Sequence, residues 1–600
     1  MSVKYYGLYL PLIIASFFFS LSSVMASNDD IAYNVIFKGI SDKDLLSDIK
    51  SISDAYNIDH QVTSSYLLQK MAQSDTEKFL QLLKARSFYR ASVKWEINTK
   101  DNALKLTFII ETGDPFILKS VKLEFADGPH EDAPKLPGIN KLGFVLNSPF
   151  LSQTALDGQD ELIRIIRSNG FPFVKIAKRE VTIDHKDQSV SVIFYIDTGS
   201  KAFFGHTTIS GLADIDESYV AGKVPWKQGD IFNGDLIEEA RKKITELGLF
   251  TSVRITEGKD IDNESMISMA IEVTERKHRS IGIGLKYLTD EGPGAKLSWE
   301  HRNIFHNGEK LSTSLELAEY TTASETSFRK QDFLQNDQTL RFSMLVSSYY
   351  PEAYESKSII GSAYIDRKLT KIFNAGSGIT LKSSTIDQLG SADSYNLLSL
   401  PVYFTMDKSN DLLDPVIGDR LLLQLTPYYR ISDESLLFNK ALFSYKRYVR
   451  ISRKPLIVVA AEVTASVIKG EVRDDIPADE RLYAGGGGSV RGYEYQSVGP
   501  LTDGVPVGGT ALFESSLEFR FKISERFGLV TFIDGGNAFK DRLFEQENPI
   551  RWGTGLGLRY YTPVGPFRLD VGFPLNRRKD INGKYIDDSY QIYISLGQAF

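Results

Sequence analysis

The stretch SVRGYEY, from Ser489 to Tyr495, decides the fold predicted for this chain. Four glycines at positions 485 to 488 precede it. Roughly 40 residues separate the strand-like run 458–467 from the next strand near Thr510, and a loop of that length usually has a function. We therefore predict a long functional loop and interpret the neighbouring segments as the frame that receives it.

Three further motifs follow this stretch before the chain ends on Phe600. They are SLEFRF at 516–521, FIDGGNAF at 532–539 and GTGLGLRYYTPVGPFRLD at 553–570. Together with the long loop they favour a β-barrel whose loop folds back into its interior.

The region from Arg279 onward has the alternation of a barrel wall. In 311–317 and 459–465 apolar residues alternate with polar or small ones, which suits a wall between lipid and a wet interior. Turn signals such as Asn307-Gly308 and Asn582-Gly583 separate the strands. We predict an all-β transmembrane barrel of about 16 antiparallel strands. A soluble β-sandwich has the same period, but it rarely needs so many consecutive long strands.

Three similar α+β units precede the barrel. The clearest has a helix at 234–247, with apolar residues on one face, and an alternating strand at 266–274. The units end at Thr112, Thr198 and Thr274, so the periods are 198 − 112 = 86 and 274 − 198 = 76 residues. Each unit is large enough for one small core.

The N-terminus has the pattern of a secretory signal. Lys4 is followed by an apolar stretch at 5–24, and Val24-Met25-Ala26 fits a peptidase site before Ser27. The alternative is an uncleaved anchor helix. No other run in the sequence approaches the roughly 20 apolar residues that a spanning helix needs.

Composition and motifs argue against catalysis. The chain has no cysteine, which excludes disulfides and thiolate chemistry, and its net charge of −7 is unlike that of a nucleic-acid binder. The glycines at 485–488 are not part of a phosphate loop, and no G-x-S-x-G motif is present. The seven histidines are scattered, and His301 and His306 form no ligand pattern with nearby acids. We expect no enzyme activity, no cofactor and no metal.

These residues and motifs resemble the BamA/TamA superfamily of outer-membrane assembly proteins with POTRA domains. The resemblance implies a signal peptide at 1–26, POTRA-like domains at 28–112, 113–199 and 200–276, and an outer-membrane barrel at 277–600. Three repeats favour the TamA branch over the BamA branch.

The resemblance also implies a structural lock in the barrel lumen. Arg491 would enter the barrel and pair with Asp534, with the help of Glu518, while Gly492 permits close approach and Tyr493 packs on the wall. Period 2 places Glu518 inside, but Asp534 is less certain because Phe532 shares its parity. The alternative for Arg491 is a solvated loop charge.

A weak seam is expected between the first and last strands. Gly282 and Gly284 interrupt the first strand near Tyr287, and glycines weaken strand pairing. Tyr593 lies in the last strand and Gly597 near its end, and Phe600 is the expected C-terminal signal.

The function that the resemblance implies is assembly at the outer membrane, with the POTRA-like domains in the periplasm. Clients would include autotransporters, a TamB-like inner-membrane protein would bind the first POTRA-like domain, and outer-membrane lipid would be a further partner. The alternatives are a passive pore or receptor, a two-partner-secretion exporter and a BamA-like general insertase.

The signal segment generates a direct test. Because Lys4, the apolar core and Ala26 form a cleavable signal, the mature protein should begin at Ser27 and fractionate with outer membranes. N-terminal sequencing checks this, and a retained Met1 would contradict it.

Overall fold

The computed structural model describes residues 31–596 except 59, 101–102, 129–131, 289–291, 432–436, 547, 563–564 and 581. The predicted signal at 1–26, Gly597, Phe600 and the side chain of Tyr287 lie outside the described part. The chain divides into two compact units. Unit 1 comprises Met1–Thr207, Trp226–Glu239 and Glu257–Met269, and unit 2 comprises Thr208–Pro225, Ala240–Thr256 and Ala270–Phe600.

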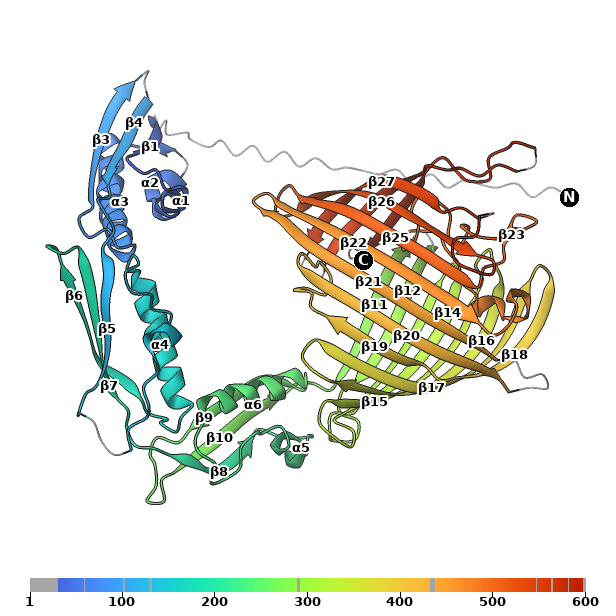
Figure 1. Cartoon of the computed structure of the whole chain (residues 1–600), viewed down its shortest axis with the longest axis horizontal. Coiled ribbons are helices and arrows are strands. Elements are labelled where there is room, and N and C mark those ends of the chain that lie inside the picture. The colour runs from blue at the N-terminus through green and yellow to red at the C-terminus, as the bar shows by residue number, and fades with distance from the viewer. Residues whose placement is uncertain are drawn as a thin grey trace, which may run out of the picture. The chain divides into compact units, whose positions relative to one another are not determined.

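The first small domain is a four-stranded sheet with helices on it (Figure 1). Its elements are β1 (Ile31–Lys38), α1 (Lys43–Ile52), α2 (Asp54–Asn57), β2 (Gln61–Val62), α3 (Ser65–Ala85), β3 (Ser92–Lys100) and β4 (Ala103–Glu111), in sheet order β2-β1-β4-β3. Ser64 caps the start of α3. The apolar face of this helix buries Phe79 and Leu83 beside Phe108 of β4. The apolar face of the helix and the apolar face of the sheet thus pack together in one core.

The second and third domains repeat this α+β pattern with three strands each. The second contains β5 (Ile117–Phe125), η1 (Ile139–Leu142), α4 (Ser152–Arg167), β6 (Lys175–Asp184) and β7 (Ser189–Asp197), in sheet order β5-β7-β6. The third contains β8 (Phe203–Ser210), α5 (Glu217–Ala221), α6 (Gly234–Glu246), β9 (Phe250–Glu257) and β10 (Met266–Glu275), in sheet order β8-β10-β9. The three repeats expected from the sequence therefore each form a sheet with helices.

One glycine follows the first strand in both the first and the third repeat. Gly39 has φ +89° and Gly211 has φ +86°, and a Cβ at either would overlap the carbonyl oxygen of Ile110 or Val273 in the neighbouring strand. Only glycine combines this backbone angle with so close an approach. The equivalent positions support the interpretation of these units as repeats.

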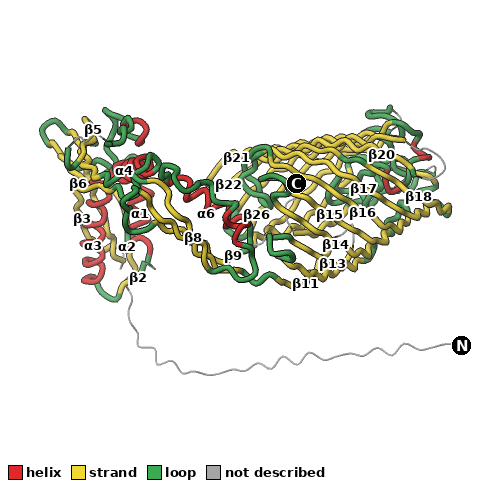
Figure 2. The backbone as a smooth tube through the Cα atoms, turned by 90° about the horizontal axis from the view of Figure 1, so that it is seen from below, coloured by secondary structure: helices red, strands yellow, loops and turns green. Residues whose placement is uncertain are grey.

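The C-terminal part of the chain is one large antiparallel sheet rolled into a barrel (Figures 1 and 2). Its strands are β11 (Arg279–Leu288), β12 (Gly292–His301), β13 (Lys310–Ala318), β14 (Thr321–Gln331), β15 (Gln338–Tyr349), β16 (Glu355–Lys368), β17 (Phe373–Gln388), β18 (Ser391–Ser399), β19 (Val402–Asp407), β20 (Gly418–Arg430), β21 (Leu437–Arg453), β22 (Leu456–Lys469), β25 (Ala511–Lys522), β26 (Phe527–Phe539), β27 (Arg551–Thr562), β28 (Gly565–Pro574) and β29 (Gln591–Leu596). β18 and β19 both pair with β17 and β20, so they share one position across a break at Leu400-Pro401. The described residues therefore form sixteen strand positions, which confirms the predicted fold class.

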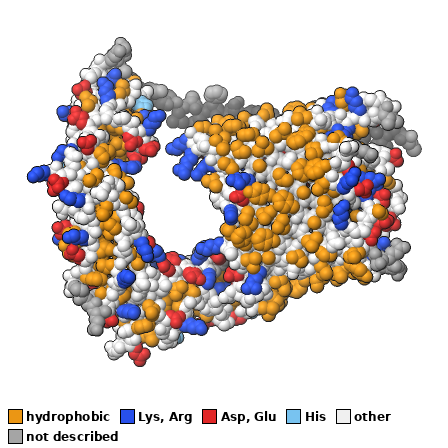
Figure 3. Space-filling view, viewed as in Figure 1, with side chains coloured by type: hydrophobic (Ala, Val, Ile, Leu, Met, Phe, Trp, Pro, Cys, Tyr) orange, Lys and Arg blue, Asp and Glu red, His pale blue; other side chains and the backbone are white. Residues whose placement is uncertain are grey.

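The outer surface of the barrel is apolar. Outward side chains such as Phe342, Met344 and Val346 are exposed, while their neighbours on the same strand face inward. Figure 3 shows the resulting apolar band, with charged side chains gathered toward the two rims. This is the surface that lipid requires. None of the described helices is long and apolar enough to cross a membrane.

The long loop, residues 470–510, folds against the inner wall. It carries two short 3-10 helices, η2 (Arg473–Asp475) and η3 (Ala478–Glu480), and a small hairpin of β23 (Leu501–Thr502) and β24 (Val505–Pro506). Val490, Tyr493 and Val498 of the loop share a buried cluster with Phe438 of β21 and Ala538 of β26. The loop therefore has a fixed place in the lumen.

Candidate functional site: a buried charge cluster beside the barrel seam

Arg491 is the centre of a charge cluster inside the barrel. The residue is 1% exposed. Nε and Nη2 donate to the two oxygens of Asp534 at 2.7 and 2.9 Å, and Nη1 donates to Glu518 at 2.7 Å and to Asp570 at 3.0 Å. A planar guanidinium can reach three carboxylates in this way, whereas a lysine ammonium cannot reproduce the paired geometry.

Strand alternation explains why these carboxylates face Arg491. Glu518 of β25 is buried while Phe519 is exposed, and Asp534 of β26 is buried while Ile533 is exposed. Phe532 shares the parity of Asp534 because both face inward, and the Arg491 guanidinium lies 3.5 Å above the Phe532 ring. The residue that made the parity of Asp534 ambiguous is thus a cation–π partner of the same arginine.

The cluster contains four residues that the sequence analysis missed. They are Asp570 and Arg568 of β28, Arg559 of β27 and Arg520 of β25, all buried. Arg559 pairs with Asp570, and Arg520 pairs with Glu518 at 2.8 Å. The alternation of side chains along β28 was the signal that could have found two of them. Phe567 and Leu569 face outward and are exposed, so Arg568 and Asp570, which alternate with them, face inward.

The backbone of the loop lies directly on a glycine surface of the wall. Gly492 has φ +102°, and a Cβ there would be 2.8 Å from the carbonyl carbon of Phe573. A Cβ at Gly572 of β28 would be 2.6 Å from the nitrogen of Gly492, and one at Gly553 of β27 would overlap the carbonyl oxygen of Arg491. Any side chain at these positions would push the loop off the wall.

Tyr493 contacts the wall with its hydroxyl. The hydroxyl lies 3.2 Å from the carbonyl oxygens of Trp552 and Asn576, to which it can donate. The ring is buried in the cluster shared by the loop and the wall. The structure therefore brings together Arg491, Gly492, Tyr493, Glu518 and Asp534.

A second set of ion pairs holds the loop to the other side of the lumen. Lys382 of β17 lies 2.7 Å from Asp479 and 2.8 Å from Glu480, and all three side chains are almost fully buried. Lys440 of β21 donates to the carbonyl oxygen of Glu480 at 3.0 Å. Here the loop supplies the acids and the wall the bases, the reverse of the arrangement at Arg491.

The seam lies between the two ends of the large sheet. β11 and β29 approach each other, but within the described residues no ladder joins them, while every other pair of neighbouring positions is hydrogen-bonded. Outward side chains of β11 are unusually open, with Ile281 at 79% and Leu285 at 87% exposed, compared with 42% for Ile592 of β29. Gly282 and Gly284 are in this open strand, and β29 has only six described residues.

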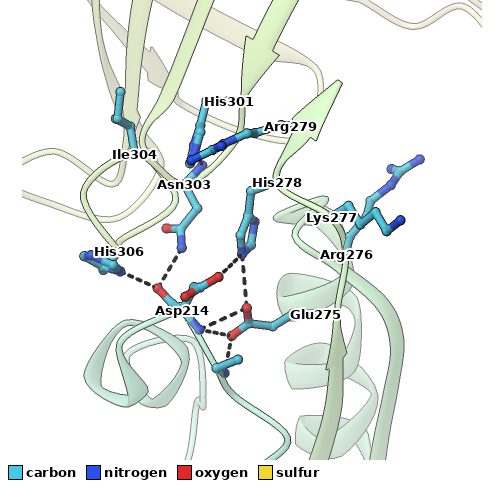
Figure 4. A pocket seen from close by; sticks show the side chains of 11 residues that line it. Asp214, Glu275, Arg276, Lys277, His278, Arg279, His301, Asn303, Ile304 and His306 are labelled. Carbon is cyan, nitrogen blue, oxygen red and sulfur yellow. Dashed lines mark hydrogen bonds and ion pairs between the residues drawn. The ribbon is translucent and has the colours of Figure 1, made fainter. Parts of the chain in front are cut away.

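A pocket of about 720 Å³ lies where β10 leads into β11 (Figure 4). His278, His301 and His306, which are scattered in the sequence, all line this pocket. His278 lies between Glu275, at 3.0 Å, and Asp214, at 3.9 Å. The sequence did not indicate this because Asp214 is far from His278 along the chain.

The Asp214, Glu275 and His278 group holds a loop in place. Among the described residues its atoms lie close enough together to hold a metal ion, within 4.8 Å. The Glu275 carboxylate, however, already accepts the backbone N–H groups of Ala213, Asp214 and Ile215, between 2.7 and 3.1 Å. Burial acts to raise the pKa of Glu275, but these hydrogen bonds and the one from His278 outweigh it and lower that pKa. The group therefore acts as a clasp on the segment before α5.

Comparison with known families identifies the barrel. The model described as the Omp85 superfamily domain matches residues 303–600. The C-terminal half of this chain is an Omp85 superfamily domain. A second model, the POTRA family, described as the surface antigen variable number repeat, matches residues 202–276. The Omp85 barrel lies in the outer membrane, with its POTRA domains in the periplasm.

Two curated relatives are each named outer membrane protein assembly factor BamA. The protein from Nitratidesulfovibrio vulgaris is 21% identical over 447 residues, covering 72% of this chain and 55% of its own length. The protein from Neisseria meningitidis is 18% identical over 596 residues, covering 89% and 73%. The chain thus spans about half the length of the first of these relatives, and both are named as assembly factors.

A solved structure shares the fold. It is the crystal structure of BamA from Haemophilus ducreyi lacking POTRA domains 1–3, with a TM-score of 0.66 and 15% identity over 80% of this chain and 100% of that chain.

The cluster predicts the effect of removing its central cation. Arg491→Ala should lower the free energy of unfolding by about 3 kcal/mol, the low end of the range for breaking a buried ion pair. The loss is at the low end because Arg520 and Arg559 still neutralise Glu518 and Asp570. Arg491→Lys should recover little, because an ammonium cannot pair with Asp534 through two donors. The measurement is the temperature of the heat-dependent shift on semi-native gels. Arg473→Ala, which removes a loop arginine paired with the exposed Asp474, is the matched control. Wild-type heat resistance in Arg491→Ala would contradict the structural role.

The Glu275 clasp predicts a dependence on pH. Since the folded pKa of Glu275 is lowered, its contribution is present above the unfolded value of about 4.3 and is lost as pH falls through the folded value. The protection factors of the amides of Ala213–Ile215, which compare each exchange rate with that of an unstructured chain at the same pH, should therefore be high near neutral pH and fall in acid. In the Glu275→Gln variant, these amides should already have lower protection factors near neutral pH, as expected for a loss of about 1 to 3 kcal/mol. Their protection should then show no step in acid. An acid step that persists in the variant would assign it to another group.

Proposed function

We propose that this protein is an outer-membrane assembly factor that helps to insert or secrete β-barrel clients through a weak barrel seam. The observation that carries the proposal is the missing ladder between β11 and β29 among the described residues. A client strand must satisfy its backbone hydrogen bonds before it enters lipid, because each unpaired group there costs several kcal/mol. An open strand edge can supply those partners by strand addition.

The inward-folded loop supports assembly over a passive pore. Residues 470–510 are fixed to the wall through Arg491 on one side and Asp479 with Glu480 on the other. A pore has no need for such a loop, because it obstructs the lumen. Purified barrel in planar bilayers should therefore give small, irregular openings, and a large steady current would favour the pore or receptor.

Arg491, Gly492, Tyr493, Glu518 and Asp534 form the proposed lock of this loop. The wall can tolerate its release, because Arg520, Arg559 and Arg568 equal in number the three carboxylates of Glu518, Asp534 and Asp570. Withdrawal of Arg491 would remove the specific geometry without leaving a net charge on the buried wall. Such a lock holds firmly and can still open.

The three repeats favour a TamA-like protein that acts with a TamB-like inner-membrane partner at the first POTRA-like domain. Clients would include autotransporters, and outer-membrane lipid is a further partner. The BamA relatives favour a second candidate, a BamA-like general insertase. Depletion in cells separates the two: loss of autotransporters alone indicates the first, and loss of most outer-membrane barrels indicates the second.

The seam is testable because the chain has no native cysteine. Cysteines introduced in pairs at Ile283 or Leu285 of β11 and at Ile592 or Ile594 of β29 should form a disulfide that blocks client assembly until it is reduced. These positions face outward, whereas Tyr593 is buried and is therefore unsuitable. Several pairs are required because the described residues contain no ladder that sets the register. Cysteine pairs between β15 and β16, which are fully laddered, are the control. A fully cross-linked seam that still assembles clients would falsify this function.

A further inference from the structure

The last barrel strand, β29, has six described residues. Over its six described residues, β29 pairs with β28 from Gln591↔Gly572 to Leu596↔Phe567. β28 itself also pairs with β27 over ten residues. In the described part of the chain, β29 has no ladder on its other side. A side chain of this strand also contacts the long loop.

Tyr593 connects β29 to the long loop. Its neighbours Ile592 and Ile594 face outward, so its ring points into the lumen, where it is 2% exposed. The hydroxyl accepts the backbone N–H of Gly492 at 2.9 Å and donates to the carbonyl oxygen of Tyr493 at 2.8 Å. Both capacities of the hydroxyl are thus used by consecutive residues of the loop.

The position of Tyr593 ties this contact to the charge cluster. Tyr593 is the register partner of Asp570, whose carboxylate binds Arg491. Gly492 follows Arg491 directly and lies on Gly572 of β28 with no room for a side chain. A movement of Arg491 away from the wall would therefore carry with it the backbone groups that Tyr593 binds.

We propose that Tyr593 is a positioning residue through which the loop holds the last strand in the barrel. The two hydrogen bonds of the Tyr593 hydroxyl add to the ladder between β28 and β29, so release of the loop loosens β29 and thereby the seam. The role of this tether in client assembly rests on the proposed function, whereas the tether itself can be measured without a client.

The decisive variant is Tyr593→Phe, which keeps the ring and its packing and removes one hydroxyl. Amide exchange of the full mature protein in lipid nanodiscs, followed by mass spectrometry, compares peptides of β29 with peptides of β26 and β27. Exchange in β29 should rise about tenfold, the effect of losing hydrogen bonds to two buried backbone groups, while β26 and β27 stay protected. Arg491→Ala should raise exchange in β29 in the same way, because it releases the loop to which Tyr593 binds.

Tyr445→Phe is the matched control. It also removes one tyrosine hydroxyl, which donates to Asp419 at 2.7 Å between β21 and β20, far along the sheet from β29. Exchange in β29 should be unchanged in this variant. A general effect of losing a hydroxyl would appear in both variants and would overturn the proposal.

Two further outcomes would overturn the tether. One is wild-type exchange in β29 of Tyr593→Phe, and the other is an equal rise over the whole barrel. A loosened β29 with normal client assembly would support the tether and count against the proposed function. Normal exchange in β29 of Tyr593→Phe, together with assembly that the seam disulfide blocks, would overturn the tether and support the proposed function.

Discussion

The structure depends on one buried cation. A guanidinium removed from water needs nearly all its donors satisfied, since the desolvation penalty of a charge is several kcal/mol and the attraction of partners offsets it only when the geometry is good. Arg491 meets this condition with three carboxylates, one serine hydroxyl and an aromatic face. These partners come from β25, β26 and β28, so the position of one loop residue depends on the register of several strands.

The cluster is balanced in a way that suits a reversible contact. With the loop in place, four buried arginines face three buried carboxylates, and without it the wall retains three of each. A wall with only acids would resist the departure of Arg491 more strongly, because carboxylates left in a dry site repel each other. The opposite anchor, in which Lys382 binds Asp479 and Glu480, uses the reversed polarity. The loop therefore spans the lumen between two charge contacts of opposite polarity. If the two ends of the loop changed places, its acids would face the acids of the wall and its arginine would face Lys382, and like charges would repel.

The seam is the one place where, among the described residues, two neighbouring strand positions of the barrel are not joined by a ladder. Elsewhere each strand has two laddered neighbours, which removes the exposed edges that sheets otherwise present. Between β11 and β29 the described residues contain no ladder, and the outward side chains of β11 are correspondingly open. Since Tyr593 binds the backbone of the loop, the lock and the seam belong to one connected region of the molecule.

The sequence by itself determined the elements and their faces. Period 2 after Arg279 predicted the barrel and the inward position of Glu518, and the helix and strand periods before it predicted the small domains. The long interval around VRGY indicated the loop. These features are local, because each depends on residues a few positions apart on one strand or helix.

Only the tertiary structure decided which inward residues meet. Asp570, Arg559 and Arg520 share the inward parity of Glu518, but their heights in the lumen depend on strand tilt and stagger, which alternation does not specify. The inward place of Phe532, the hydroxyl contact of Tyr593 with Gly492, and the gathering of His278 with Asp214 join residues that are distant in the chain. Side-chain period fixes the face on which a residue lies, whereas strand register and loop path fix its neighbours, and those arise only when the sheet closes around the loop.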